Sequence, residues 1–262
     1  MDIPGYFAAI LIGISLGLIG GGGSVLTVPV LVYLFRVNAV LATTYSLFVV
    51  GAASALGSFS YFKKGLVQLR SVLLFGLPSI AAVFLARSFL LPAIPATLFT
   101  VGGFTLTKDI LLLLLFAVLM LVAARSMIRQ RELVGENDAP LRPSLVVGEG
   151  LLVGALTGLV GAGGGFLIIP VLVNVLKMPM KTAIGTSLVI ITLNSLSGFV
   201  FSLAGSHIQW QFLLSITAVA MIGILIGSRL SNYLEGQRLR PVFGWFVLLM
   251  GVFIILRETL LP

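Results

Sequence analysis

The glycine-rich stretch Gly17-Leu18-Ile19-Gly20-Gly21-Gly22-Gly23-Ser24 breaks an apolar run near the N-terminus, and a second copy, Gly158-Leu159-Val160-Gly161-Ala162-Gly163-Gly164-Gly165, follows 141 residues later. A short apolar run with a proline comes after each copy, and Pro29 and Pro170 occupy equivalent positions. Interrupted backbone at membrane depth is tolerated only where protein buries it or where it lines a cavity. A matched pair of Gly/Pro-interrupted segments in two halves is therefore the best sequence indication of a transporter binding site.

The two stretches belong to an internal duplication. At an offset of 141 residues, positions 17–35 and 158–176 are identical at ten of nineteen sites, and the match continues without a gap. The later matched pairs are Ala42 with Ala183, Ser46 with Ser187, Ser54 with Ser195, Gly57 with Gly198 and Gln68 with Gln209.

Close helix packing is the alternative explanation of the glycines, because small residues let helices approach one another in membranes. Four near-consecutive glycines, present twice, destabilise a helix too much for packing to be their only role. The isolated Gly13, Gly76 and Gly223 are better explained by packing.

The composition is that of an integral membrane protein, with 59% hydrophobic and 9% charged residues. A soluble domain carries about 25% charge. The net charge of +8 comes from basic residues in short loops, as expected of charges that orient a membrane protein rather than bind nucleic acid. The absence of cysteine excludes disulfides, thiolate metal sites and cysteine nucleophiles. The N-terminal residues lack the basic region that begins a cleaved signal peptide, so we expect none. We expect a multi-pass protein of the bacterial inner membrane.

The apolar runs predict two similar halves, 1–128 and 145–262, joined by a polar cytoplasmic linker over 129–144. Each half begins with a broken element, 3–35 or 145–176, whose second arm is too short to span a bilayer by itself. The full-length spans are expected at about 39–61, 72–94, 108–128, 182–204, 212–230 and 242–258.

The broken elements could be kinked crossings, which make the halves parallel, or re-entrant hairpins, which make them inverted. The inverted arrangement places 12 of the 16 basic residues in the cytoplasm, whereas the parallel one divides them 8 to 8. The four left outside are Arg36, Arg87, Lys108 and Arg257. We therefore expect an all-α integral membrane protein of two inverted-topology repeats, each a glycine-broken re-entrant helical hairpin followed by three transmembrane helices, with both termini outside.

Two such hairpin tips that meet near the midplane would form an anion site without any basic side chain. Glycines leave backbone N–H groups unshielded, and the start of a helix carries unpaired N–H groups and about half a positive charge. Ser24 could cap the first arm, while prolines in a first turn would move the helix starts towards Val28 and Ile169. The expected backbone ligands are Gly20, Gly21, Gly22, Gly23, Ser24, Gly161, Ala162, Gly163, Gly164 and Gly165.

Hydroxyl and amide side chains at matched places in the next spans are the expected further ligands. Ser46, Ser187 and Thr186 are preferred because the duplication puts them equally near the centre, and Asn194 ranks lower because Ala53 is its counterpart. Such hydroxyls could instead bond to carbonyls of their own helices.

Few ionisable residues fall within the spans, where they are functional candidates by default. Glu149 could carry a proton, although a solvated helix end is favoured for it. Snorkelling to the interface is the favoured account of Arg87 and Arg229. The single histidine, His207, lies in an expected outer loop, so no metal site, cofactor or histidine-based catalysis is predicted.

At these same residues the chain resembles the sulfite exporter TauE/SafE family. The motif G-L-x-G-x-G-G-G-x-L-x-x-P-x-L runs from Gly158 to Leu172 and, in variant form, from Gly17 to Leu31; Ala183-Ile184-Gly185-Thr186-Ser187 follows the second copy. The resemblance covers nearly the whole chain and implies transport of sulfite, sulfoacetate or other organosulfonates. The first copy departs from the pattern at Tyr45, whose bulk is expected to narrow the cavity.

The expected function is that of a secondary transporter, not an enzyme, that moves small sulfur-containing anions by alternating access. An anion channel, or a transporter of another small anion, is the alternative. The scarcity of carboxylates favours a co-transported proton over a sodium site built from acidic side chains. The expected partners are thus a small anion and the lipid bilayer, with no nucleic acid; a homo-oligomer is left open.

Overall fold

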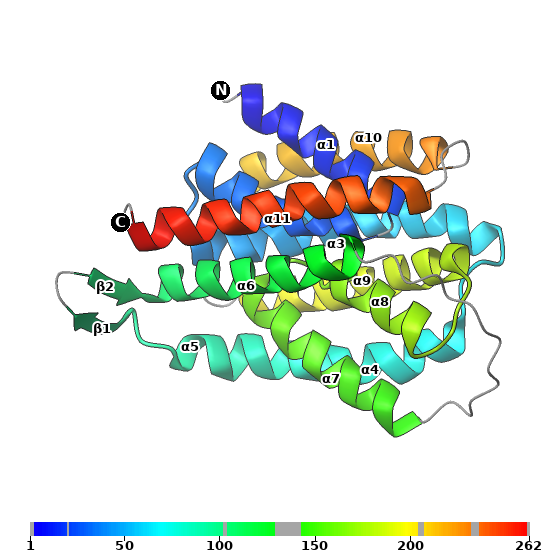
Figure 1. Cartoon of the computed structure of the whole chain (residues 1–262), viewed down its shortest axis with the longest axis horizontal. Coiled ribbons are helices and arrows are strands. Elements are labelled where there is room, and N and C mark those ends of the chain that lie inside the picture. Colours follow the sequence, from blue (N-terminus) through cyan, green and yellow to red (C-terminus); the bar gives the residue numbers. More distant parts are fainter. Residues whose placement is uncertain are drawn as a thin grey trace.

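The computed structural model describes residues 3–19, 21–101, 104–128, 143–203, 207–231 and 236–260 (Figure 1). Gly20 and most of the expected linker, 129–142, lie outside these ranges. The elements of the first half are α1 (Ile3–Ile19), the 3₁₀-helix η1 (Gly22–Leu26), α2 (Thr27–Pro29), the π-helix η2 (Val30–Leu34), α3 (Ala39–Lys63), α4 (Leu69–Leu85), the π-helix η3 (Ala86–Leu90), α5 (Leu91–Ala93), β1 (Thr97–Val101), β2 (Phe104–Thr107) and α6 (Lys108–Ile128). The second half contains α7 (Pro143–Val160), α8 (Gly165–Asn174), α9 (Met180–Ser202), α10 (Trp210–Leu230) and α11 (Gly236–Leu260).

Within the described ranges, five helical segments are long and apolar enough to cross a membrane: α3, the continuous segment from α4 to α5, α6, α9 and α10. Their bounds agree to within three residues with five of the expected spans. The sixth expected span lies inside α11. Large apolar side chains such as Phe7 in α1, Leu77 in α4 and Leu249 in α11 are more than 60% exposed, as expected where lipid is the neighbour. The chain is a mostly helical, multi-pass membrane protein.

One short element departs from the expected all-helical fold. β1 and β2 form an antiparallel hairpin, with Thr100 opposite Thr105 and Val101 opposite Phe104. The hairpin extends beyond the helices at one end of the molecule, between α5 and α6 (Figure 1). Threonine and aromatic residues favour strands, and Gly102-Gly103 between two such runs is a hairpin signal.

Two pairs of helices pack in parallel, with glycines of one helix against the backbone of the other. The contacts of α1 with α10 are Gly13 with Gly223 and Gly17 with Gly227; those of α7 with α4 are Gly150 with Phe75, Gly154 with Ser79 and Gly158 with Val83. The packing role expected for Gly13 and Gly223 is confirmed. For Gly76 it is wrong, because a Cβ there would meet only Val72 of its own helix, at 4.0 Å.

Two further pairs pack antiparallel. The contacts of α3 with α9 are Leu47 with Gly198, Gly51 with Leu196, Gly57 with Leu188 and Tyr61 with Gly185; those of α6 with α11 are Ala117 with Gly251 and Ala124 with Gly244. When the halves are exchanged at the 141-residue offset, the α1–α10 pair becomes the α7–α4 pair, and each antiparallel pair maps onto itself.

Both glycine-broken elements double back on themselves. In the first, the ring of Tyr6 near the start of α1 packs edge-on against Phe35 just after η2, with 5.6 Å between centroids. In the second, α8 runs beside α7, and Gly164 packs against Thr157 and Val153. Neither element is a straight rod through the molecule.

Candidate functional site

The two glycine turns meet inside the protein. A Cβ added to Gly165 would lie 2.6 Å from the Cα of Gly21 and 2.8 Å from its carbonyl oxygen, so the two backbones are in direct contact. Gly21, Gly23 and all residues from 161 to 165 are buried. Turns that are 141 residues apart in the chain therefore share one interior location.

The first turn is closed by Ser24. Its hydroxyl donates to the carbonyl of Gly21 at 2.7 Å, and its backbone N–H donates to the same oxygen at 3.3 Å. The expected capping role of Ser24 is wrong, because the helical segment already begins at Gly22 and Ser24 lies within it. The alternative, an α-helix that begins near Val28, agrees with the structure, because the 3₁₀-helix ends at Leu26 and α2 begins at Thr27. Pro29 lies in the first turn of α2, where a missing N–H costs no intrahelical hydrogen bond, and the π-helix η2 follows.

The second turn requires glycine for its backbone conformation. Gly161, Gly163 and Gly164 have φ values of 74°, 69° and 70°, a region that side chains with a Cβ disfavour. The N–H groups of Leu167 and Ile168 donate to the Gly164 carbonyl, so α8 begins at Gly165 rather than near Ile169. The N–H groups of the first residues of such a helix have no partners within it.

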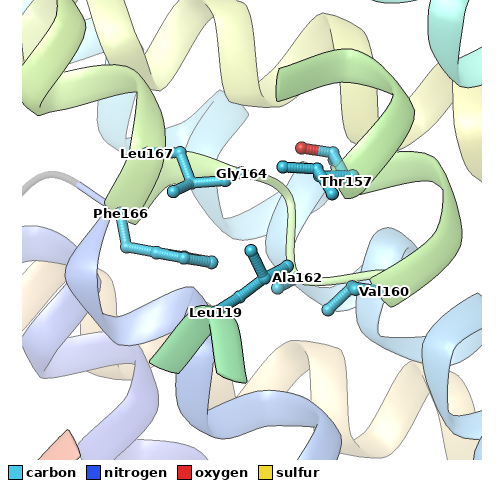
Figure 2. A pocket seen from close by; sticks show the side chains of 8 residues that line it. Leu119, Thr157, Val160, Ala162, Gly164, Phe166 and Leu167 are labelled. Atoms are coloured by element: carbon cyan, nitrogen blue, oxygen red, sulfur yellow. The ribbon is translucent and has the colours of Figure 1, made fainter. Parts of the chain in front are cut away.

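Apolar side chains of α6, α7 and α8 surround the second turn (Figure 2). They leave only a gap that has no room for a water molecule. The gap is lined by Leu119, Leu156, Thr157, Val160, Ala162, Gly164, Phe166 and Leu167. The second turn is therefore shielded from water on this side.

The expected side-chain ligands differ in what they do. Ser46 is completely buried, and its hydroxyl has no hydrogen-bond partner among the described residues. Ser187 donates to the carbonyl of Ile184 at 2.9 Å, as an ordinary helix serine does. The amide nitrogen of Asn194 donates to the Ser79 hydroxyl at 2.6 Å. The amide oxygen of Asn194 is buried and has no hydrogen-bond partner in the described part of the chain.

Thr186 takes part in a hydrogen bond between the two halves of the chain. Its hydroxyl accepts the backbone N–H of Gln68, just before α4, at 3.0 Å. At the equivalent place in the other half, the phenolic oxygen of Tyr45 accepts the backbone N–H of Gln209, just before α10, at 2.8 Å. We call this matched pair of bonds the latches. Tyr45 therefore holds the start of a helix, and its ring packs against Phe212.

Two serines that were not expected as ligands are also buried with unpartnered hydroxyls among the described residues. The hydroxyl of Ser195 lies 2.9 Å from where a Cβ of Gly163 would be, and Val50 packs on the same glycine. Ser195 and its counterpart Ser54 are completely buried, and neither hydroxyl has a partner among the described residues. The sequence contained one signal for these two serines: serine occupies both positions at the 141-residue offset.

The structure contradicts the expectation for Arg87, because its side chain does not snorkel to the membrane interface. It is 4% exposed, within the π-helix η3, and its Nη1 donates to the hydroxyls of Thr43 at 3.2 Å and Thr44 at 3.4 Å. A π-helical turn inserts a residue into the α-helical register and so redirects a side chain. The Cα and Cβ of Thr43 pack against Gly161. Thr43 therefore contacts both the buried guanidinium group of Arg87 and the second glycine turn. A buried basic side chain this close to the turns was not expected from the sequence.

The only carboxylate expected to carry a proton, Glu149, is half-buried rather than at a solvated helix end. It lines a groove of about 190 Å³ between α6, α7 and α8. Ser126 of α6 and Pro170 of α8 line the same groove. Arg229 is exposed, in agreement with the expectation for it.

Comparison with known proteins decides the family. The sequence profile described as sulfite exporter TauE/SafE matches residues 6–254, which is nearly the whole chain. The chain belongs to the TauE/SafE family. This TauE/SafE protein is therefore a membrane transporter in its broad class.

Relatives of this TauE/SafE protein come from distant organisms. A probable membrane transporter protein of Xylella fastidiosa (strain Temecula1) is 31% identical over 257 residues, covering 95% of this chain and 92% of the relative. The probable membrane transporter protein YunE of Bacillus subtilis is 26% identical, covering 89% and 90% of the two chains. One from Methanocaldococcus jannaschii is 24% identical and covers 94% and 92%. No solved structure matches the chain.

Proposed function

We propose that this TauE/SafE protein is a secondary transporter of small sulfur-containing anions, such as sulfite, sulfoacetate or other organosulfonates, across the bacterial inner membrane. The observation that carries the proposal is the contact between Gly21 and Gly165 in the protein interior. It brings two helix starts, at Gly22 and Gly165, to one place. Converging helix starts attract an anion through unpaired N–H groups and aligned peptide dipoles.

The substrate site in this proposal combines the two turns with nearby side chains. The backbone ligands are residues 20–24 and 161–165. Ser46, Ser187, Thr186 and Asn194 remain in the set predicted from sequence, and Ser54 and Ser195 join it. Buried polar atoms usually have hydrogen-bond partners. The unpartnered oxygens of Ser46, Ser54, Ser195 and Asn194 therefore support a cavity that a polar solute occupies during transport.

Alternating access follows in the proposal from two inverted repeats, 1–128 and 145–262, on either side of a cytoplasmic linker. The support is geometric. Equivalent helices α3 and α9 pack antiparallel, and so do α6 and α11. A two-fold axis that relates antiparallel partners lies across the helices, hence in the plane of a membrane that they span. The hairpins then enter from opposite faces and meet at the centre, the arrangement in which one repeat rocks against the other.

The orientation can be tested by cysteine labelling, because the chain has no cysteine of its own. His207→Cys and Lys64→Cys place single thiols at exposed positions, before α10 and after α3. We expect a membrane-impermeant maleimide to label His207→Cys in intact cells and Lys64→Cys only after permeabilisation. Labelling of both thiols from the same side contradicts the inverted arrangement.

Flux in proteoliposomes tests the function. We expect sulfite and sulfoacetate to move faster than chloride or phosphate, with transport that saturates and that accelerates under an imposed proton gradient. The proton enters the proposal as the coupling ion because Glu149 lies half-buried in the groove beside the second hairpin. Sulfur anions that move no faster than chloride contradict the substrate class. Non-saturating, uncoupled flux indicates an anion channel instead.

A further inference from the structure

Only one edge of the Arg87 guanidinium group forms hydrogen bonds with described residues. Nη1 donates to the hydroxyls of Thr43 and Thr44, which fixes the plane of the group. Both hydroxyls also contact the carbonyl of Val40, at 2.8 and 3.3 Å, so they are held in place by their own helix. The guanidinium group is thus oriented by α3 and does not swing freely.

The opposite edge of the same group is buried and unused. Nε and Nη2 have no hydrogen-bond partner in the described part of the chain, and no described carboxylate forms an ion pair with Arg87. Nε–H and the neighbouring Nη2–H are the parallel donors with which arginine grips two oxygens of one anion. A buried charge left without a counter-charge is strongly destabilising. An intramembrane arginine in this state therefore points to an anionic partner from outside the chain.

The position of Arg87 connects this edge to the glycine turns. Thr43 accepts from Arg87 and packs with its Cα and Cβ on Gly161. The adjacent Ala86 packs against Gly158, on the helix that leads into the same turn. An anion held by Arg87 is therefore next to the second turn and not at a remote surface.

The charge has no equivalent in the other half of the chain. At the 141-residue offset Arg87 corresponds to Ser228, whose hydroxyl donates to the carbonyl of Leu225 in its own helix. The neighbouring Arg229 is exposed. Among the residues whose burial the structure describes, the duplicated framework thus carries one buried cation, on one side of the contact between the turns.

We propose that Arg87 binds the transported anion with its Nε and Nη2 edge, and that this edge selects anions with two coplanar oxygens on one centre, such as sulfite, sulfonates and carboxylates, over single-atom anions. The proposal rests on the proposed function and deepens it, because it names the group that reads the substrate. A sulfite or sulfonate group offers two oxygens to the parallel donors, whereas chloride receives the charge without the matched pair of hydrogen bonds.

The test compares Arg87→Lys with the wild type in proteoliposomes. Lysine keeps the positive charge and loses the planar pair of donors. We expect the half-saturating concentrations of sulfite and sulfoacetate to rise about tenfold or more, since hydrogen bonds to charged groups are the strong ones. Residual chloride flux is expected to change by less than about twofold, because a point charge serves a spherical anion equally well. The matched control is Arg229→Lys, which makes the same change at an exposed position and leaves all fluxes unchanged.

A second variant keeps the arginine, in case Arg87→Lys does not fold. Thr43→Val removes one acceptor that orients Nη1 while it preserves the size of the side chain. We expect a severalfold rise in the half-saturating concentration of the sulfur anions, again without a change for chloride. The proposal is overturned if both variants keep the wild-type half-saturating concentrations for the sulfur anions. It is also overturned if transport of chloride and of the sulfur anions changes equally. If proteoliposomes that contain the wild-type protein transport no sulfur anion, the proposed function is contradicted instead, before any variant is compared.

Discussion

Gly165→Ala is expected to abolish transport although it adds a single methyl group. The new Cβ would lie 2.6 Å from the Cα of Gly21 and 2.6 Å from Cδ1 of Ile191. Carbon atoms in contact are normally about 3.5–4.0 Å apart, so the two turns must separate by about 1 Å. The φ of Gly165 is not in the left-handed region, so alanine adds no backbone strain, and the effect comes from the contact alone. Flux of sulfite into proteoliposomes measures it.

Gly76→Ala is the matched control for this substitution. Gly76 is also a buried glycine in a helix, but its Cβ would meet only Val72, at 4.0 Å. We expect Gly76→Ala to transport like the wild type. Wild-type flux in a folded Gly165→Ala protein would remove the contact between the turns from the transport mechanism.

Gly154→Leu is expected to produce the largest loss of stability. A Cβ at this position would lie 2.7 Å from the Cα of Ser79 and 2.8 Å from its carbonyl carbon, so α7 cannot stay against α4. Ser79 also accepts the hydrogen bond of Asn194, which moves with it. Over-packing of an ordinary core site costs about 1–3 kcal/mol, and the cost here is higher because backbone rather than a side chain must move. The apparent unfolding temperature in detergent measures the loss.

Gly148→Leu is the control on the same helix. Nothing lies within 4 Å of a Cβ at Gly148, and the position is exposed, so leucine meets lipid there. We expect an unfolding temperature at or above that of the wild type. Equal destabilisation by both leucines would mean that α7 does not pack tightly on α4.

The spans and the doubled-back elements were predictable because their signals are local. Apolar runs of the right length, broken by glycines at a constant offset, indicated six spanning helices, and the structure places five of them within three residues of the expected bounds. The contact between the turns follows less directly. Gly21 meets Gly165, although at the 141-residue offset Gly165 corresponds to Ser24, so the register of the contact depends on how the hairpins dock.

The parts that were missed depend on side-chain direction. Arg87 lies near the end of an apolar run, where snorkelling is the usual behaviour, and only the π-helical turn at Ala86–Leu90 redirects it onto α3. The hydrogen bond from the Gln68 N–H to the Thr186 hydroxyl was missed as well, although Thr186 itself was expected as a ligand from its place in the repeat. Ser54 and Ser195 are identical at the 141-residue offset, but serine in an apolar helix commonly bonds to its own backbone, so the sequence does not single them out as ligands.

The latches of Tyr45 and Thr186 have a consequence for the transport cycle. Each joins one half of the chain to the other, and they sit at opposite ends of the antiparallel pair of α3 and α9. Both bonds are formed in the same structure, so the two halves are joined at both ends of this helix pair. In the proposed cycle of alternating access, one of these two bonds breaks when the halves separate at that end. The phenol of Tyr45 accepts one of the two hydrogen bonds and the aliphatic hydroxyl of Thr186 accepts the other. The two bonds are therefore not required to be equally easy to break.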